Sequence, residues 1–167
     1  MKTLDNKHNE RGTTIAEFAV VALLFFTLVF GIIEFGRLLY THNALTDATR
    51  RGARYAVLHH GATENDKQAV RNYVIYGPRG TFDVDGNPTS SPVVPGLTNE
   101  MVIVDFDGVN NAGQLLPFGS NIGSATVKIQ DYEFSLNIPV VGRTLTLPAY
   151  TTTAMAECAG EIPDPIN

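Results

Sequence analysis

The N-terminal part of the chain carries one long apolar run followed by a helical stripe. No side chain from Phe18 to Ile33 is charged, and the run from Thr14 to Ile33 approaches the ~20 residues that a helix needs to cross ~30 Å of hydrocarbon. Beyond it, small or apolar residues recur every three or four positions, as on one helix face: Leu38, Leu45, Ala48, Gly52, Tyr55 and Ala56. No proline occurs before Pro78, so we predict one continuous helix from Thr13 to about Leu58. The alternative is two helices broken near Gly31 or Gly36, but a glycine costs a helix only ~1 kcal/mol.

The rest of the chain predicts a second helix and a small sheet. Thr63 and Asp66 have the spacing of a capping box, and Gly77-Pro78 ends the helix that they start. A phase slip near Gln130-Asp131 is interpreted as a bulge, and Pro148, which has no N–H to donate, is placed at an edge or a bulge. The predicted strands are Met101–Phe106, Ala125–Ile138 and Arg143–Ala156. The predicted fold class is α+β, with the long N-terminal helix packed against a small antiparallel sheet.

These elements predict four segments along the chain. Residues 1–12 form a polar leader, 13–34 a transmembrane helix, 35–62 the continuation of that helix, and 63–167 a soluble α+β head. A cleaved secretory signal would have a shorter apolar core followed by a small-x-small cleavage site. The run ends instead in Ile33–Arg37, which lacks that pattern, so we expect the apolar helix to be retained.

A single carboxylate, Glu17, lies near the start of the apolar run. A charge there is unfavourable, by roughly 2.5–3.5 kcal/mol at the bilayer centre and by less near the surface. If a peptidase cuts after Gly12, Thr13 gains an α-amino group with a pKa near ~8. Positions 13 and 17 share one helix face, so Glu17 can neutralise this amine or that of a neighbouring subunit. The alternative is that Gly12 ends a polar tail and Glu17 lies among lipid headgroups.

The composition and net charge of the chain argue against one class of partner, nucleic acids. The chain has 167 residues and a net charge of −5, whereas nucleic-acid binding draws on clustered Lys and Arg. We therefore predict no nucleic-acid partner. Cys158 is the one cysteine, so an internal disulfide is excluded. We interpret this residue as a small buried hydrophobe; the alternative is a disulfide to another chain in an oxidising compartment.

No segment carries a convincing catalytic or metal-binding motif. The run Asp83–Asn87 resembles part of a calcium loop, but its glycine is misplaced and no distal Glu follows. It is interpreted as a turn. The adjacent His59-His60 suits the negative end of a helix dipole, and no ligand pattern nearby completes a metal site. We predict no metal, no cofactor and no enzymatic activity. Three arginines are interpreted as a solvated face, or alternatively as contacts to lipid headgroups or another subunit: Arg50, Arg51 and Arg54.

The stretch Arg11–Tyr55 resembles the start of TadE-like proteins, which are minor pseudopilins of the tight-adherence (Flp-type) pilus system in the type IV pilin superfamily. The matching elements are Arg11-Gly12, Ala16-Glu17-Phe18, Gly31–Phe35 and Asn43–Arg54. The resemblance implies that a prepilin peptidase cuts between Gly12 and Thr13 on the cytoplasmic side. It also implies that Glu17 guides the docking of subunits in the filament.

The same resemblance implies partners and a location. The partners are the prepilin peptidase, other pilins and pseudopilins, the inner-membrane assembly platform and the lipid bilayer. The location is the bacterial inner membrane, crossed once, with a cytoplasmic N-terminus and a head that is periplasmic or, in the pilus, extracellular. Two alternatives are an uncleaved single-pass anchor that displays a periplasmic binding module, and an anchored enzyme with a cluster around His59 or Asp105.

Overall fold

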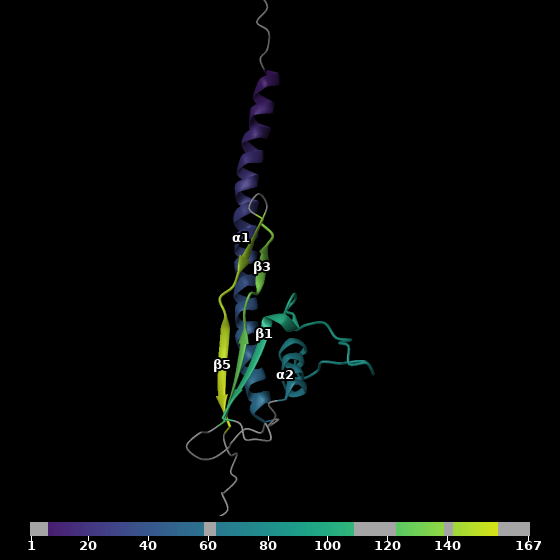
Figure 1. Ribbon diagram of the computed structural model, residues 1–167. Coiled ribbons are helices and arrows are strands. Elements are labelled where there is room, and N and C mark those ends of the chain that lie inside the picture. The colour runs from purple at the N-terminus through teal and green to yellow at the C-terminus, as the bar shows by residue number, and fades with distance from the viewer. Residues whose placement is uncertain (1–6, 59–62, 109–122, 139–141, 157–167) are drawn as a thin grey trace, which may run out of the picture. The chain divides into compact units, whose positions relative to one another are not determined.

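The computed structural model describes residues 7–58, 63–108, 123–138 and 142–156 (Figure 1). The helices are α1 (Lys7–Leu58) and α2 (Glu64–Tyr76), and a 3-10 turn spans Asn99–Met101. The strands are β1 (Val102–Asp107), β2 (Ser124–Ile129), β3 (Glu133–Leu136), β4 (Arg143–Thr146) and β5 (Tyr150–Met155). The chain divides into two compact units. We name them the anchor unit (Met1–Leu39 and Ser135–Leu145) and the head unit (Tyr40–Phe134 and Thr146–Asn167).

Helix α1 is continuous, and its end at Leu58 confirms the prediction. The predicted start at Thr13 is wrong. The helix begins at Lys7 and passes through Gly12 without a break. The residues before Gly12 include Glu10 and Arg11, which are good helix formers, and no proline. The polar leader therefore contributes the first turns of the helix.

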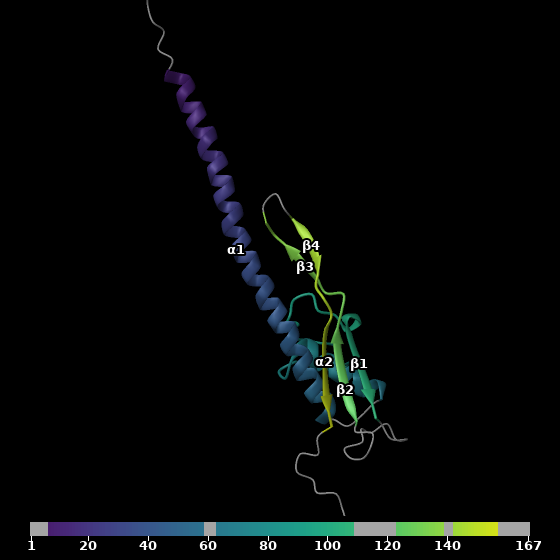
Figure 2. The same ribbon diagram turned by 90° about the vertical axis from the view of Figure 1, so that its left-hand side faces the viewer.

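The head unit contains a three-stranded antiparallel sheet in the order β1-β2-β5 (Figure 2). The central strand β2 places Val127 opposite both Val104 of β1 and Thr152 of β5. Alternate residues of β2 are fully buried, namely Ala125, Val127 and Ile129, as expected where one sheet face is covered. The predicted α+β fold, with a long helix packed against a small antiparallel sheet, is confirmed.

Two of the predicted strands are divided in the structure. The segment predicted as Ala125–Ile138 forms β2 and β3 in different sheets, and Asp131 between them has a φ of 57°. The phase slip is therefore a change of sheet and not a bulge. The segment predicted as Arg143–Ala156 divides around Pro148 into β4 and β5, because proline cannot donate to a ladder. Strands β3 and β4 pair as a separate two-stranded sheet.

The core of the head unit forms where the C-terminal part of α1 meets the sheet and α2. Four residues of the predicted stripe are buried, whereas Leu38 and Tyr55 are half-buried. The buried residues of this part of α1 are mostly small: Leu45, Ala48, Thr49, Gly52, Ala53 and Ala56. The Oγ1 atoms of Thr49 and Thr152 lie 3.0 Å apart, which links α1 to β5. Helix α2 contributes three buried side chains to the same core, Val70, Val74 and Ile75. Small side chains on α1 thus let three layers approach closely.

Gly52 marks the closest of these approaches, and we expect Gly52→Ala to destabilise the head unit. A Cβ atom at this position would lie 2.3 Å from Cγ2 of Val74. Overpacking of this kind lowers the free energy of unfolding by about 1–3 kcal/mol. The change is measured by urea unfolding of the full chain in detergent micelles, monitored by the near-UV circular dichroism of its tyrosines.

Gly36→Ala is the matched control. A Cβ atom there meets nothing within 4 Å, and alanine favours a helix over glycine by up to ~1 kcal/mol. Gly36→Ala is therefore expected to leave the transition unchanged or to raise it. Equal effects of the two substitutions would show that α1 and α2 are not in tight contact at Gly52.

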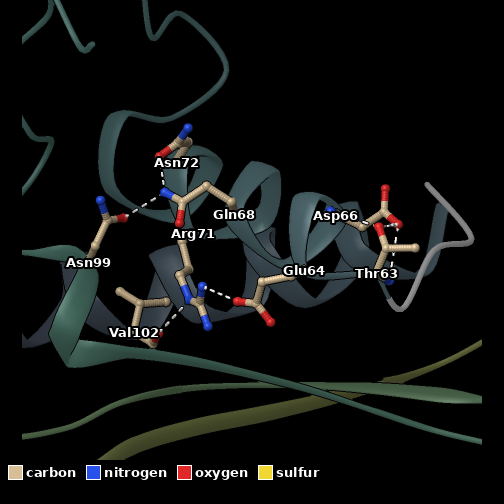
Figure 3. Close-up of polar contacts among 8 residues, drawn as sticks. All are labelled: Thr63, Glu64, Asp66, Gln68, Arg71, Asn72, Asn99 and Val102. Atoms are coloured by element: carbon tan, nitrogen blue, oxygen red, sulfur yellow. Dashed lines mark hydrogen bonds and ion pairs between the residues drawn. The ribbon is translucent and has the colours of Figure 1, made fainter. Parts of the chain in front are cut away.

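Helix α2 starts at the predicted capping box (Figure 3). The Thr63 hydroxyl accepts a hydrogen bond from Asp66 N, and the Asp66 carboxylate accepts one from Thr63 N. Further along, Arg71 Nη1 donates to Glu64 at 2.8 Å, and Arg71 Nε donates to the carbonyl of Val102 at 3.3 Å. These bonds fix α2 against the start of β1.

Candidate functional site

The N-terminal half of α1 exposes a continuous apolar surface. Its large exposed side chains include Ile15, Phe18, Leu24, Phe25, Leu28, Ile32 and Phe35. Soluble monomers rarely expose contiguous apolar patches of more than a few hundred Å². This surface therefore requires lipid or other helices around it.

Among the described residues, one helix is long and apolar enough to cross a membrane, within Gly12–Leu58 and near the N-terminus. A signal sequence near the N-terminus would meet the same criteria of length and composition. The N-terminal part of α1 is thus a candidate membrane anchor. Its exposed surface agrees with this assignment, since a core helix of a soluble protein would be mostly buried.

The residues predicted as a cleavage and pairing site lie at the start of this surface. Gly12, Thr13 and Glu17 all belong to α1 and are exposed. Positions four apart on a helix have Cβ atoms about 5–6 Å apart, so α1 brings Thr13 and Glu17 to one face. A Cβ atom at Gly12 would meet nothing within 4 Å. Packing in the described structure therefore gives no reason for glycine at this position.

The apolar surface has a second carboxylate at its other end, and this one is buried. Glu34 is only 8% exposed. Its Oε2 atom accepts hydrogen bonds from Arg37 Nη2 at 2.7 Å and from Arg37 Nε at 3.0 Å. Arg37 Nη2 also donates to the carbonyl of Ser135. A buried carboxylate needs such a partner, and here the partner comes from the next turn of the same helix.

The two carboxylates differ in how their charge is balanced. Glu34 has Arg37, whereas among the side chains that the structure describes none forms an ion pair with Glu17. The Glu34–Arg37 ion pair was not predicted from the sequence. The i,i+3 spacing of the two residues on a helix is the signal that could have indicated it. Within the described residues, Glu34 thus has an ion-pair partner on its own helix, and Glu17 has none.

The Asp83–Asn87 segment forms a turn, as predicted, and its carboxylate serves the loop itself. Asp83 Oδ1 accepts hydrogen bonds from Asn87 N at 2.7 Å and Asp85 N at 3.0 Å, and Gly86 has a φ of 81°. The backbone hydrogen bond from Asn87 is the largest cause that lowers the pKa of Asp83 below its ordinary value. The carboxylate therefore stays ionised at neutral pH.

The other candidate residues do not converge on a catalytic cluster. Within the described ranges, no three His, Cys, Asp or Glu side chains are grouped so as to hold a metal ion. His42 Nδ1 lies 2.8 Å from the hydroxyl of Tyr150, whose pKa is raised by burial. This contact joins α1 to β5. Asp105 is an exposed residue of β1. The candidates His59, His60 and Cys158 lie outside the described residues.

Comparison with known protein families points to the same segment. Residues 12–54 match the family model of the TadE-like proteins. The resemblance stated from the sequence is thus confirmed over residues 12–54, which lie within α1. The TadE-like segment begins at Gly12 and contains Glu17, Glu34 and Arg37. No curated protein and no solved structure matches the chain.

Proposed function

We propose that this protein is a membrane-anchored minor pseudopilin that takes part in the assembly of a tight-adherence pilus. The single observation that carries the proposal is the exposed apolar surface of the TadE-like helix, with one carboxylate, Glu17, five residues after Gly12. Lipid or a bundle of similar helices would cover the apolar side chains of such a surface and remove them from water. The proposed partners are other pilins and pseudopilins, the inner-membrane assembly platform and the bilayer.

Processing by a prepilin peptidase between Gly12 and Thr13 is the second part of the proposal. Glycine inside α1 weakens the helix by up to ~1 kcal/mol relative to alanine, so Gly12 favours the local unwinding that a peptidase needs. Cleavage there removes the first turns of α1 and converts Thr13 into a cationic N-terminus on the Glu17 face. The protein itself is proposed to have a structural role and no enzymatic activity.

Pairing of charges explains how the helices assemble. In the apolar interior of a helix bundle, an isolated charge costs several kcal/mol, and a close opposite charge offsets much of this. Glu17 and the Thr13 amine, of the same chain or a neighbouring one, form such a pair. The proposed topology has residues 1–12 in the cytoplasm, residues 13–34 across the inner membrane and the head beyond it.

Localisation in the native host tests the proposal. Pili are sheared from cells that carry an epitope-tagged chain, and the sheared and membrane fractions are probed. We expect the chain in both fractions, and fewer pili in cells that lack it. A chain found only in membranes, in cells that pilate normally without it, would favour the alternative of an uncleaved anchor with a periplasmic binding module.

A further inference from the structure

A basic groove crosses the head unit between α1 and β5. It encloses about 440 Å³ and is lined by Asp47, Arg50, Arg51, Arg54, Thr152, Thr153 and Ala154. The four α1 residues are spaced three and four apart and so share one helix face. The sequence shows this face of α1, but the neighbouring strand is supplied by residues about a hundred positions later.

Two cations of the groove have no partner in the described part of the chain. Arg51 Nη1 pairs with Asp47, whereas Arg50 and Arg54 are exposed and form no ion pair with a described side chain. Like charges at i,i+4 destabilise a helix by a few tenths of a kcal/mol. Helix stability therefore does not explain the two arginines, and the groove keeps a net positive charge in a chain whose net charge is −5.

The wall of the groove opposite the arginines is an open strand edge. Strand β5 pairs with β2 on one side and is the last described strand of its sheet on the other. Outer edges present unpaired backbone groups and readily bind another chain. An extended or loop segment with negative charge thus fits the groove both by its backbone and by its charge.

The head unit itself carries a loop of this kind. A bridge between Phe82 and Pro88 closes the loop, and the two hydrogen bonds accepted by Asp83 hold its shape. Val84 at its tip is fully exposed, and Asp83 and Asp85 on either side of it are exposed as well. An apolar side chain held in water between two carboxylates suits contact with a basic surface.

The segment that carries the loop extends away from the β5 edge of the head unit. In Figure 1 the teal segment that follows α2 extends to the right, and β5 forms the left edge of the sheet. In Figure 2 β5 lies in front and α2 behind, which agrees with this placement. Because the loop extends away from β5, these complementary features occupy separate places on the surface and allow a head-to-tail contact that repeats from copy to copy.

We propose that the Asp83–Asp85 loop of one copy docks into the basic groove of a second copy. Asp85 contacts Arg50 and Arg54, and Val84 packs beside Ala154 at the edge of β5. This contact would give the proposed assembly function a specific interface between two heads. It rests on that function only because copies of the chain must meet for it to form. It involves the head unit alone, so it does not depend on cleavage after Gly12.

Disulfide trapping between two full-length chains tests the contact. Val84→Cys is introduced in one tagged chain and Ala154→Cys in another, both with Cys158→Ser, and the uncleaved chains are mixed in detergent micelles and oxidised. We expect a mixed dimer, and little dimer from either variant alone. Because Arg50→Glu with Arg54→Glu places like charges opposite Asp85, this pair of substitutions should reduce the yield at least about tenfold. Adding Asp85→Lys in the loop-bearing chain should restore part of it.

A control variant and a truncation complete the test. Lys67→Glu with Arg79→Glu makes the same change of charge outside the groove and should leave the yield unchanged. Equal loss in this control, or no mixed dimer, would overturn the proposal. So would a mixed dimer that forms only after residues 157–167 are deleted, since the acidic C-terminal segment of the chain would then be the occupant. Normal cleavage and piliation alongside any of these results would leave the proposed function standing without this contact.

Discussion

A Glu17→Ala variant is expected to insert into the membrane and to be processed as the unchanged chain is, yet to be largely lost from pili. Without the carboxylate, the Thr13 amine enters the helix bundle with no opposite charge. Breaking one partner of a buried pair costs about 3–5 kcal/mol, and each 1.4 kcal/mol is a factor of about ten in binding. We therefore expect the amount of this chain in sheared pili to fall at least about tenfold, as measured by quantitative immunoblotting.

Two variants separate charge from general perturbation of the helix. Glu17→Asp keeps the carboxylate and should retain part of the incorporation. Thr27→Ala removes another polar group of the apolar helix, a hydroxyl that donates to the carbonyl of Leu23 four residues earlier, and should have no effect. Incorporation of Glu17→Ala at the level of Thr27→Ala would refute the role of Glu17.

Gly12→Leu is expected to abolish processing and to keep the chain in the membrane. A Cβ atom at position 12 would meet no atom of the chain within 4 Å, and leucine favours the helix, so the substitution does not damage the fold. A loss of cleavage therefore has to come from the peptidase. Intact-mass measurement of the membrane-extracted chain, coexpressed with active prepilin peptidase, should show that residues 1–12 are retained.

Gly31→Ala provides the comparison for Gly12→Leu. Gly31 also lies in α1, and a Cβ atom there would meet nothing within 4 Å, but this glycine is far along the helix from the proposed cleavage site. The Gly31→Ala chain should be processed like the unchanged chain. Efficient cleavage of Gly12→Leu would show that Gly12 is not the recognition element.

The helices could be predicted from local signals, whereas the strand pairings could not. The apolar period of α1 and the capping box of α2 depend on residues within a few positions of one another, and both are confirmed. The division of β2 from β3 depends on the positive φ of Asp131 and on partners far away in sequence. Alternation alone does not show to which sheet a strand belongs, and this is why one long strand was predicted.

The residues of the candidate site also fall into two groups, those visible in the sequence and those that only the fold brings together. Gly12 and Glu17 stand out in the sequence because a glycine and a lone carboxylate mark an otherwise apolar run. The burial of Glu34 and the contact of Arg37 with Ser135 need the folded anchor unit. Likewise, the arginine face of α1 is visible in the sequence, but the groove exists only because β5 lies beside it.

The N-terminal residue of the mature protein tests the central claim most directly. The chain is extracted from membranes of cells with an active prepilin peptidase and is sequenced from its N-terminus. The account predicts a chain that starts at Thr13, so that a cationic amine lies on the same helix face as Glu17. A chain that still starts at Met1 in these cells would contradict it.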